Sequence, residues 1–350
     1  MNKKNFLKKL IVSIIIFFNL VAGIVFIFDP FFHYHKPIKP LKAVLTQAEY
    51  QVIGTLRTFD YDSLIAGSSM AENYNNKWFD EAFNCTTIKA VKPGANTSDL
   101  VYLLEAAYEE QEIKNIFYTL DIAAITTFVR QHYVNDGMPL YLYNKNPLDD
   151  VKYLFNKHIL FEDIPYMIAN SFLGNYDEGD SFNWAKYKEF GTLHYTPTLE
   201  KQPNVVKKEY ESNVEFNLTK LEKLIKSHPE TNYIFMIPPY SSLWWYESYM
   251  CGNLEQDFYA LQQIFERLLS FENVEIHCFQ NMEDIVSDLS LYMDTIHYNA
   301  NVNKKLVDLI STNEYRITLE NKDIFLENIK ILADKCINVY APEYISKLPN

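Results

Sequence analysis

The chain has 350 residues, of which 48% are hydrophobic and 22% are charged. This composition excludes a largely disordered chain and fits one large domain, or a domain with an insertion. The formal net charge of −13 argues against a nucleic acid partner, because phosphate neutralisation requires clustered Lys and Arg side chains.

The four cysteines lie far apart in the chain and form neither a CxxC motif nor a Cys/His cluster of the kind that binds zinc. We therefore predict isolated thiols, with no metal and no cofactor. An extracellular location would permit disulfides, but the sequence selects no pairing. The cysteines are Cys85, Cys251, Cys278 and Cys336.

Residues 10–28 form an apolar run of nineteen residues in which only Ser13 and Asn19 are polar. At about 1.5 Å per residue, a helix of this length spans the ~30 Å hydrocarbon core of a bilayer. Four lysines precede the run, and the positive-inside rule therefore places the N-terminus in the cytoplasm and everything after residue 29 outside. The sequence predicts a single-pass protein of the cell membrane.

A cleaved signal peptide is the alternative interpretation of this segment. Its apolar stretch normally covers about 7–15 residues, fewer than here. The run is also followed by Phe31, Phe32 and Tyr34, which resemble an aromatic belt at the membrane interface. We therefore favour an uncleaved anchor, and we interpret His33 and His35 as interfacial polar residues rather than metal ligands.

Beyond the anchor (residues 1–29) and a predicted stalk (30–60), short apolar runs alternate with helical patterns. Such alternation predicts an α/β domain over residues 61–350, with a parallel sheet covered by helices on both faces. An insertion at about 126–226, rich in Tyr and Pro, separates the third and fourth strands and is interpreted as a cap over the sheet. The predicted strands are Ser63–Ala66, Thr87–Val91, Asn115–Leu120, Tyr233–Ile237 and Val274–Phe279.

Four helices have recognisable ends or apolar stripes. Ser98 is predicted to cap a helix through Tyr108, and Asn213 to cap one through Ile225. Two further helices are predicted over Leu254–Leu269 and Asn321–Ala333.

The sequence Gly67-Ser68-Ser69 follows the first predicted strand directly. A hydroxyl nucleophile requires an exposed position at the carboxyl edge of a parallel sheet, and Ser69 has such a position. Ser69-x-x-Glu72 is also a capping-box pattern, in which the serine would only bond to backbone N–H groups. Taken alone, the motif leaves both interpretations open.

Asp294 and His297 lie just past the last predicted strand. A serine hydroxyl is a weak nucleophile until a base accepts its proton, and that base requires a carboxylate to fix its tautomer. His297 and Asp294 fit these roles, although a His beside a helix start is often only a capping or surface residue. Ser69 and His297 both follow parallel strands at the edge where open α/β sheets bind ligands.

A glycine-x-serine after the first strand and a DxxH near the end resemble the first and last motifs of the SGNH, or GDSL-like, hydrolase family. The resemblance covers residues 61–311, leaving the insertion unmatched. It implies a flavodoxin-like, three-layer α/β/α fold. It also implies Ser69 as nucleophile, His297 as base and Asp294 as the residue that orients the base.

The same resemblance implies an oxyanion hole formed by the N–H groups of Ser69 and Gly94, with Ser68 in place of the usual Asp of the first motif. The family's third motif supplies an Asn, but this chain has Asp121 there. An ionised Asp121 cannot donate a hydrogen bond and would repel an oxyanion. Asn73 or Asn96 could supply the missing amide.

Tyr240, Trp244 and Trp245 follow the fourth predicted strand and, with Ser68 and Asn73, are the predicted substrate-cleft residues. Their aromatic faces could stack on a sugar ring or line an acyl pocket. Packing in the core or in a lid is the alternative interpretation for these aromatic side chains.

The sequence thus predicts an extracytoplasmic serine esterase or O-acyltransferase that acts through an acyl-serine intermediate on a cell-surface polysaccharide or teichoic acid. The anchor and the Gly-Ser-Ser variant also resemble membrane-tethered proteins that work beside membrane-bound O-acyltransferases, including the D-alanine transfer proteins of teichoic acid synthesis. A catalytically silent protein that binds glycan, or holds such an acyltransferase, is the alternative. Residues 29–350 carry a net charge of −17, which favours a neutral glycan over a polyanionic backbone.

Overall fold

The computed structural model describes residues 3–127, 138–174, 176–193 and 195–348. The chain forms two compact units. The anchor unit consists of Met1–Asp60 and Tyr133–Ser181, and the sheet unit consists of Tyr61–His132 and Phe182–Asn350. The predicted stalk and part of the predicted insertion therefore belong to the same unit, although they are far apart in sequence.

A six-stranded sheet with the order β2-β1-β3-β4-β5-β6 forms the centre of the sheet unit. The first five strands are parallel, and β6 pairs with β5 in the antiparallel direction. Most strand residues are buried and apolar, as expected when helices cover both faces of a parallel sheet. The strands are β1 (Ser63–Gly67), β2 (Thr87–Val91), β3 (Asn115–Thr119), β4 (Asn232–Ile237), β5 (Val274–Cys278) and β6 (Arg316–Ile317).

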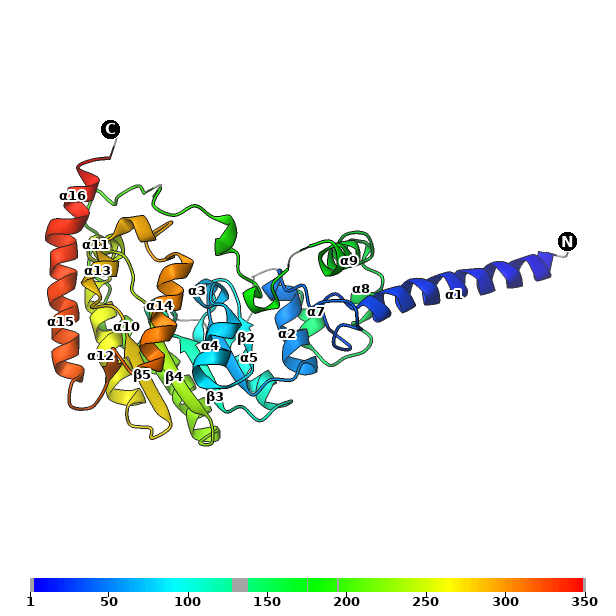
Figure 1. Cartoon of the computed structure of the whole chain (residues 1–350), viewed down its shortest axis with the longest axis horizontal. Helices are drawn as coiled ribbons and strands as arrows, with labels where there is room; N and C mark the ends of the chain where they lie inside the picture. Colours follow the sequence, from blue (N-terminus) through cyan, green and yellow to red (C-terminus); the bar gives the residue numbers. More distant parts are fainter. Residues whose placement is uncertain (1–2, 128–137, 175, 194, 349–350) are drawn as a thin grey trace. The chain divides into compact units, whose positions relative to one another are not determined.

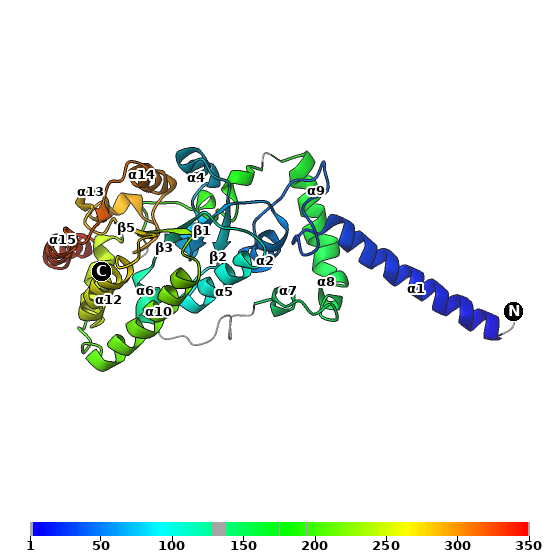
Figure 2. The ribbon, with the colours of Figure 1, turned by 90° about the horizontal axis from the view of Figure 1, so that it is seen from below.

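Helices cover both faces of this sheet (Figure 2). One face carries α4 (Asn76–Phe83) and α14 (Ala300–Ser311), and the other carries α5 (Thr97–Tyr108), α10 (Lys207–Ser227) and α12 (Leu254–Leu268). The remaining helices of the unit are α3 (Ser69–Glu72), α6 (Ile122–Thr126), η3 (Ala185–Tyr187), α11 (Ser242–Met250), α13 (Glu283–Val286), η4 (Leu289–Leu291), α15 (Lys322–Lys335), η5 (Cys336–Tyr340) and α16 (Ala341–Ile345).

The predicted α/β architecture and its five parallel strands are confirmed, each strand to within one residue at either end. The cap of α5 was predicted at the wrong residue. Asn96 is the N-cap, and it exchanges hydrogen bonds with Asp99 in a capping box. Asn213 does not begin a helix either: it lies inside α10, and its side chain donates to the Thr126 carbonyl at 3.0 Å.

The four cysteines belong to the sheet unit and are free thiols. Cys278 and Cys336 are buried, and burial raises the pKa of each thiol to about 12. Cys85 is half-buried, and its pKa is raised to about 11, mainly by burial.

The anchor unit begins with α1 (Lys3–Phe28), which is long and apolar enough to cross a membrane. Only Val25 of this helix is buried. The other helices of the unit are α2 (Ala48–Thr58), α7 (Leu140–Tyr143), α8 (Val151–Leu154), η1 (Ile159–Asp163), α9 (Ile164–Phe172) and η2 (Glu178–Asp180), most of which are labelled in Figure 1.

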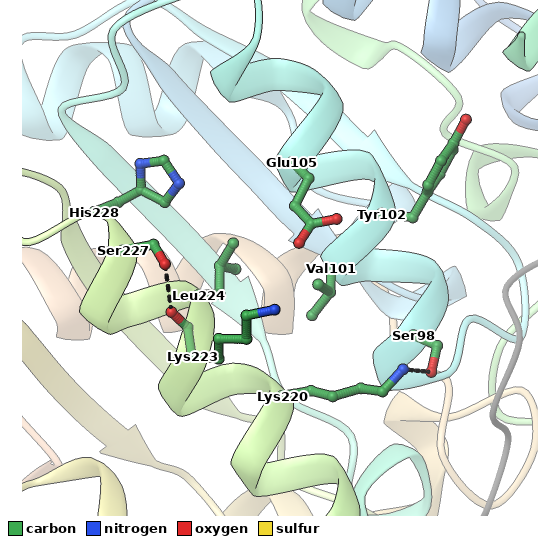
Figure 3. A pocket seen from close by; sticks show the side chains of 9 residues that line it. All are labelled: Ser98, Val101, Tyr102, Glu105, Lys220, Lys223, Leu224, Ser227 and His228. Carbon is green, nitrogen blue, oxygen red and sulfur yellow. Dashed lines mark hydrogen bonds between the residues drawn. The ribbon is translucent and has the colours of Figure 1, made fainter.

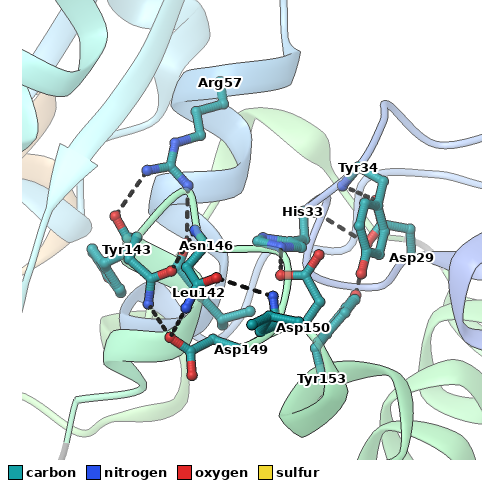
Figure 4. Close-up of polar contacts among 12 residues, drawn as sticks. Asp29, His33, Tyr34, Arg57, Leu142, Tyr143, Asn146, Asp149, Asp150 and Tyr153 are labelled. Carbon is teal, nitrogen blue, oxygen red and sulfur yellow. Dashed lines mark hydrogen bonds and ion pairs between the residues drawn. The ribbon is translucent and has the colours of Figure 1, made fainter.

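A buried carboxylate, Asp29, terminates α1 (Figure 4). It accepts hydrogen bonds from the backbone N–H groups of His33, Tyr34 and His35 at 3.0, 2.7 and 2.9 Å, and from the Tyr153 hydroxyl at 2.7 Å. Burial raises the pKa of Asp29, and these four hydrogen bonds oppose the rise. Because Tyr153 belongs to α8, the contacts tie the end of α1 to the rest of the anchor unit.

Phe31 and Phe32 are buried rather than interfacial, so the predicted aromatic belt is wrong for both. Phe31 packs against Tyr50 and Tyr153, and Phe32 packs against Phe59. The reason is the turn after Asp29, which directs the chain back into the anchor unit. Of the two neighbouring histidines, His33 bonds to Asp150 at 3.1 Å, and His35 bonds to backbone carbonyls.

Asp257 in α12 gives the sheet unit a pH-dependent stability. Burial raises the pKa of this carboxyl to about 7, although Ser248 donates a hydrogen bond to it at 2.6 Å. The folded state therefore binds a proton that the unfolded state releases near pH 4, and stability falls as the pH rises from about 4 to about 7. We expect Asp257→Asn to be more stable than wild type at pH 8 by roughly 4 kcal/mol, and to differ little from it at pH 4.

Chemical denaturation of the detergent-solubilised full chain at pH 4, 6 and 8 measures this difference. The exposed Asp323→Asn is the matched control and is expected to track wild type. An Asp257→Asn variant that gains nothing between pH 4 and 8 would contradict the assignment.

Candidate active site

The carboxyl ends of β1, β3 and β4 lie at the point of the sheet where the strand order changes direction. The second strand, β2, pairs with one side of β1, and the third strand, β3, pairs with the other side. Ligands of open α/β sheets bind in the crevice at such a switch point. Ser68 and Ser69 follow β1 here, Asp121 follows β3, and Tyr240 follows β4.

Ser69, His297 and Asp294 form a continuous hydrogen-bonded chain in the sheet unit. The Ser69 hydroxyl lies 2.8 Å from Nε2 of His297, and Nδ1 of His297 lies 2.6 Å from Oδ2 of Asp294. Both His ring nitrogens are therefore occupied, with a hydroxyl on one side and a carboxylate on the other. This geometry allows the imidazole to accept the serine proton while the carboxylate holds its tautomer.

The Asp294 carboxylate also folds the loop that carries His297. Its Oδ1 accepts the backbone N–H groups of Ile296 and His297 at 2.9 and 2.8 Å. Burial acts to raise the pKa of Asp294, but the hydrogen bonds to the His297 ring and to these N–H groups outweigh it, and the pKa is lowered. Asp294 therefore stays ionised, as a residue that orients an imidazole must.

Contacts at both ends hold this loop in place. Tyr292 and Tyr298 are buried and form an isolated antiparallel bridge. Ser241, after β4, donates to the Thr295 carbonyl through its backbone N–H at 3.1 Å and its hydroxyl at 2.7 Å. Together these contacts position the imidazole relative to the end of β1.

The turn between β1 and α3 presents the Ser69 side chain. Gly67 has φ +151°, and a Cβ there would lie 2.7 Å from the Ala71 Cβ and 3.0 Å from the Thr119 Cβ. Ser68 is the N-cap of α3 and makes no side-chain capping bond, and Ser69 is the first helical residue. The capping-box interpretation of Ser69 is therefore wrong, because the Ser69 hydroxyl bonds to His297.

Asp121 lies beside this chain of groups and is held by two hydroxyls. Ser68 bonds to its Oδ2, and Tyr240 donates to its Oδ1 at 2.9 Å. The Tyr240 oxygen itself accepts the backbone N–H of Ile122 at 3.2 Å, so the tyrosine proton is directed to Asp121. Burial raises the pKa of Asp121, while the two hydroxyls and the nearby His297 act to lower it, and the net shift is upward.

The predicted alternative donors, Asn73 and Asn96, are engaged elsewhere. Asn73 is buried, its amide nitrogen bonds to the Ser69 carbonyl at 3.3 Å, and its Oδ1 accepts the Ala185 N–H. The Asn96 amide bonds to Asp99 at 2.9 Å within the capping box. Gly94 is exposed at a turn after the end of β2, which lies beside β1. Its φ is +60°, and no atom lies within 4 Å of where a Cβ would be.

The three predicted cleft aromatics lie at different depths. Trp245 has no exposed surface and packs on Phe258, which agrees with the core-packing alternative and excludes direct contact with a ligand in this conformation. Tyr240 is also buried, but its hydroxyl bonds to Asp121. Trp244 is partly exposed and packs on Tyr240 with ring centroids 4.5 Å apart.

Trp184 is a residue of the site that the sequence did not predict. Its indole Nε1 donates to the Ser69 carbonyl at 3.3 Å, and its ring meets the edge of the His297 ring with centroids 5.0 Å apart. It comes from the segment 182–193 of the predicted insertion, where no motif distinguishes it from the many other aromatic residues.

A separate cavity of about 300 Å³ lies between α5 and α10 (Figure 3). Lys220 bridges its rim by donating to the Ser98 hydroxyl at 2.8 Å, and Lys223, Glu105 and His228 also line it. None of its lining residues belongs to the Ser69 site.

Comparisons with known proteins add little to this geometry. No family model matches the chain, and no curated protein matches it. A solved structure described as that of a "putative platelet activating factor from Streptococcus pneumonia" matches with 13% identity and a TM-score of 0.40. The match covers 76% of this chain and 90% of that one, and at this TM-score it carries no argument about activity.

Gly67 is expected to be essential to the turn that carries Ser69. A Gly67→Ala variant would combine a disfavoured φ with one contact of 2.7 Å, shorter than Cβ atoms tolerate, and a second tight contact of 3.0 Å, at a cost of roughly 2–4 kcal/mol. Gly94→Ala is the matched control, because its φ is also positive but no atom lies within 4 Å of the new Cβ, so that about 1 kcal/mol is expected. Equal losses in a denaturation experiment would contradict the packing argument.

Proposed function

We propose that this protein is a membrane-anchored serine esterase or O-acyltransferase of the SGNH type that works on the outer side of the membrane. The observation that carries the proposal is the hydrogen-bonded chain of Ser69, His297 and Asp294. The strand order 2-1-3-4-5, followed by one antiparallel strand, supports a flavodoxin-like fold for the sheet unit.

In the proposed reaction, the Ser69 oxygen attacks the carbonyl carbon of an ester while His297 Nε2 takes the hydroxyl proton. Asp294, kept ionised by its hydrogen bonds, stabilises the resulting imidazolium. His297 then returns the proton to the leaving alcohol, and an acyl-serine remains. Water releases the acid in an esterase, and a carbohydrate hydroxyl accepts the acyl group in a transferase.

Asp121 is proposed to act as a neutral acid in this reaction. A carboxyl whose pKa is raised can keep its proton and donate it as a hydrogen bond to a developing oxyanion, as the amide of an Asn would. Its two hydroxyl partners fix the orientation of the carboxyl group. The backbone N–H groups of Ser69 and Gly94 are the other proposed donors.

The proposed substrate is an acylated cell-surface polymer. The four lysines in the first two turns of α1 support an orientation in which the residues after position 29 lie outside the cell. The charge of −17 on residues 29–350 favours a neutral glycan, although a teichoic acid carrying cationic D-alanyl esters is also compatible. A membrane-bound O-acyltransferase is the proposed partner if the reaction is transfer rather than hydrolysis.

A fluorophosphonate probe tests the nucleophile directly, because its phosphorus is attacked by an activated serine with loss of fluoride. We expect the wild-type protein in membranes to be labelled on Ser69, and the Ser69→Ala variant not to be labelled. Ser311→Ala, which removes an exposed serine hydroxyl bonded to the Asp308 carbonyl, is expected to label as wild type does.

If correctly folded wild-type protein is not labelled, the proposal that it is an enzyme is wrong. A catalytically silent protein that binds glycan or holds an acyltransferase would then be favoured, and the carboxylate in the oxyanion region is the observation that supports this alternative. Cell-surface acylation that is retained in a Ser69→Ala, His297→Ala double variant but lost on deletion of the whole gene would point the same way.

The pH dependence of labelling tests the role of Asp121. Labelling is expected to fall at high pH, where ionised Asp121 no longer donates a hydrogen bond and repels the oxyanion. Because burial raises the pKa of Asp121, this loss begins at a higher pH than it would for an exposed carboxyl. Asp121→Asn is expected to remove the alkaline fall and to increase the rate there by at least about ten-fold.

Asp323→Asn serves again as the control, since this exposed carboxylate lies on α15 and is expected to leave the profile unchanged. An alkaline fall that persists unchanged in Asp121→Asn would show that another group causes it.

A further inference from the structure

The anchor unit exposes a continuous apolar stripe along η1 and α9. The stripe consists of Phe161, Pro165, Ala169, Phe172 and Leu173, which recur at helical spacing and are all exposed. Phe161 and Leu173 leave 73% and 88% of their surface uncovered. The opposite face of α9 buries Ile164 and Met167, so this stripe is not the side that packs on the unit. Large exposed apolar patches mark an interaction site.

The neighbouring helix α8 continues the apolar surface. Val151 and Phe155, four positions apart, are exposed on and just after this helix, and Leu148 precedes them. The ring of Phe155 meets that of Phe18 in α1 with centroids 5.4 Å apart. The apolar surface is thus continuous with the helix proposed to cross the membrane.

The position of Phe18 places this surface relative to the bilayer. Phe18 lies ten residues before Phe28, the end of α1, which corresponds to about 15 Å along the helix axis. Half of a ~30 Å hydrocarbon core has this thickness. If residues 10–28 span the core, then Phe155 lies at a depth that lipid acyl chains occupy, and the side of the anchor unit next to α1 is immersed in the outer leaflet.

Polar groups of the same segment are compatible with such a location. Lys152 and the exposed Lys157 and His158 can reach the headgroup layer with their polar ends. The four acidic side chains between residues 149 and 163 all have partners, which lowers the cost of placing them near lipid. The pairs are Asp149 with Lys152, Asp150 with His33, Glu162 with His158, and Asp163 with Gln47.

The junction at Asp29 ties the surface to the end of α1. Asp29 follows α1 directly, and it bonds to Tyr153 of α8 and to three backbone N–H groups after the helix (Figure 4). The exposed apolar residues of α8, η1 and α9 therefore have a fixed position relative to the membrane-crossing helix.

We propose that the surface formed by α8, η1 and α9 inserts into the outer leaflet of the bilayer, so that the anchor unit has a second membrane contact beside α1. The occupant of this surface is lipid: acyl chains against the stripe, and anionic headgroups against the lysines. The inference rests on the proposed membrane crossing of α1 but is independent of the chemistry at Ser69.

Depth-dependent fluorescence quenching tests the proposal with the full chain in phosphatidylcholine and phosphatidylglycerol liposomes. Single cysteines replace Phe161, Phe172 or Leu173 in a background without the four native cysteines, and each is labelled with an environment-sensitive dye. Ile14→Cys reports on α1 itself, and Leu319→Cys, exposed on the sheet unit, is the matched apolar control. Circular dichroism verifies the fold of each variant.

We expect lipids with a nitroxide in the acyl chain to quench the dye at positions 14, 161, 172 and 173, and to leave position 319 unquenched. Quenching at position 14 alone would overturn the second membrane contact while leaving the anchor intact, and would leave a protein partner as the occupant of the stripe. Absence of quenching at all positions would overturn the membrane crossing of α1, and the second contact with it. Neither outcome changes the expected labelling of Ser69.

Discussion

The hydrogen bond between Ser69 and His297 joins two side chains that lie 228 positions apart in the chain. The sheet makes this contact possible, because parallel strands end at a common edge and deliver the loops after β1 and β5 to it. Neither residue would have a chemical role without the other. A serine hydroxyl alone is a poor nucleophile, and the imidazole gains its orientation only from Asp294.

The surroundings of this contact explain why its geometry is stable. The Asp294 carboxylate uses both oxygens, one on the imidazole and one on the backbone of its own loop. Trp184 covers the other side by bonding to the Ser69 carbonyl and packing against the His297 ring. Side chains held by packing and hydrogen bonds lose little further freedom when a substrate binds, which is what a proton-transfer site requires.

Much of the sheet unit was predictable from sequence, because buried parallel strands consist of short continuous apolar runs in the sequence. Asp294 and His297 were also predictable, since a three-residue spacing lets one carboxylate reach both a ring nitrogen and a backbone N–H. The strand β6 was missed because two residues carry no pattern. Trp184 and the burial of Trp245 were missed because the packing around them comes from segments that are distant in sequence. For the same reason, the sequence did not predict that residues 1–60 and residues 133–181 form one unit.

Burial limits the redox chemistry of two of the four thiols. Thiol–disulfide exchange proceeds through the thiolate, and burial keeps Cys278 and Cys336 in the protonated form at any physiological pH. With all four cysteines free, the fold of the sheet unit does not rely on disulfide bonds. The two buried thiols therefore exchange slowly with external disulfides, because neither the thiolate form nor access from solvent is provided.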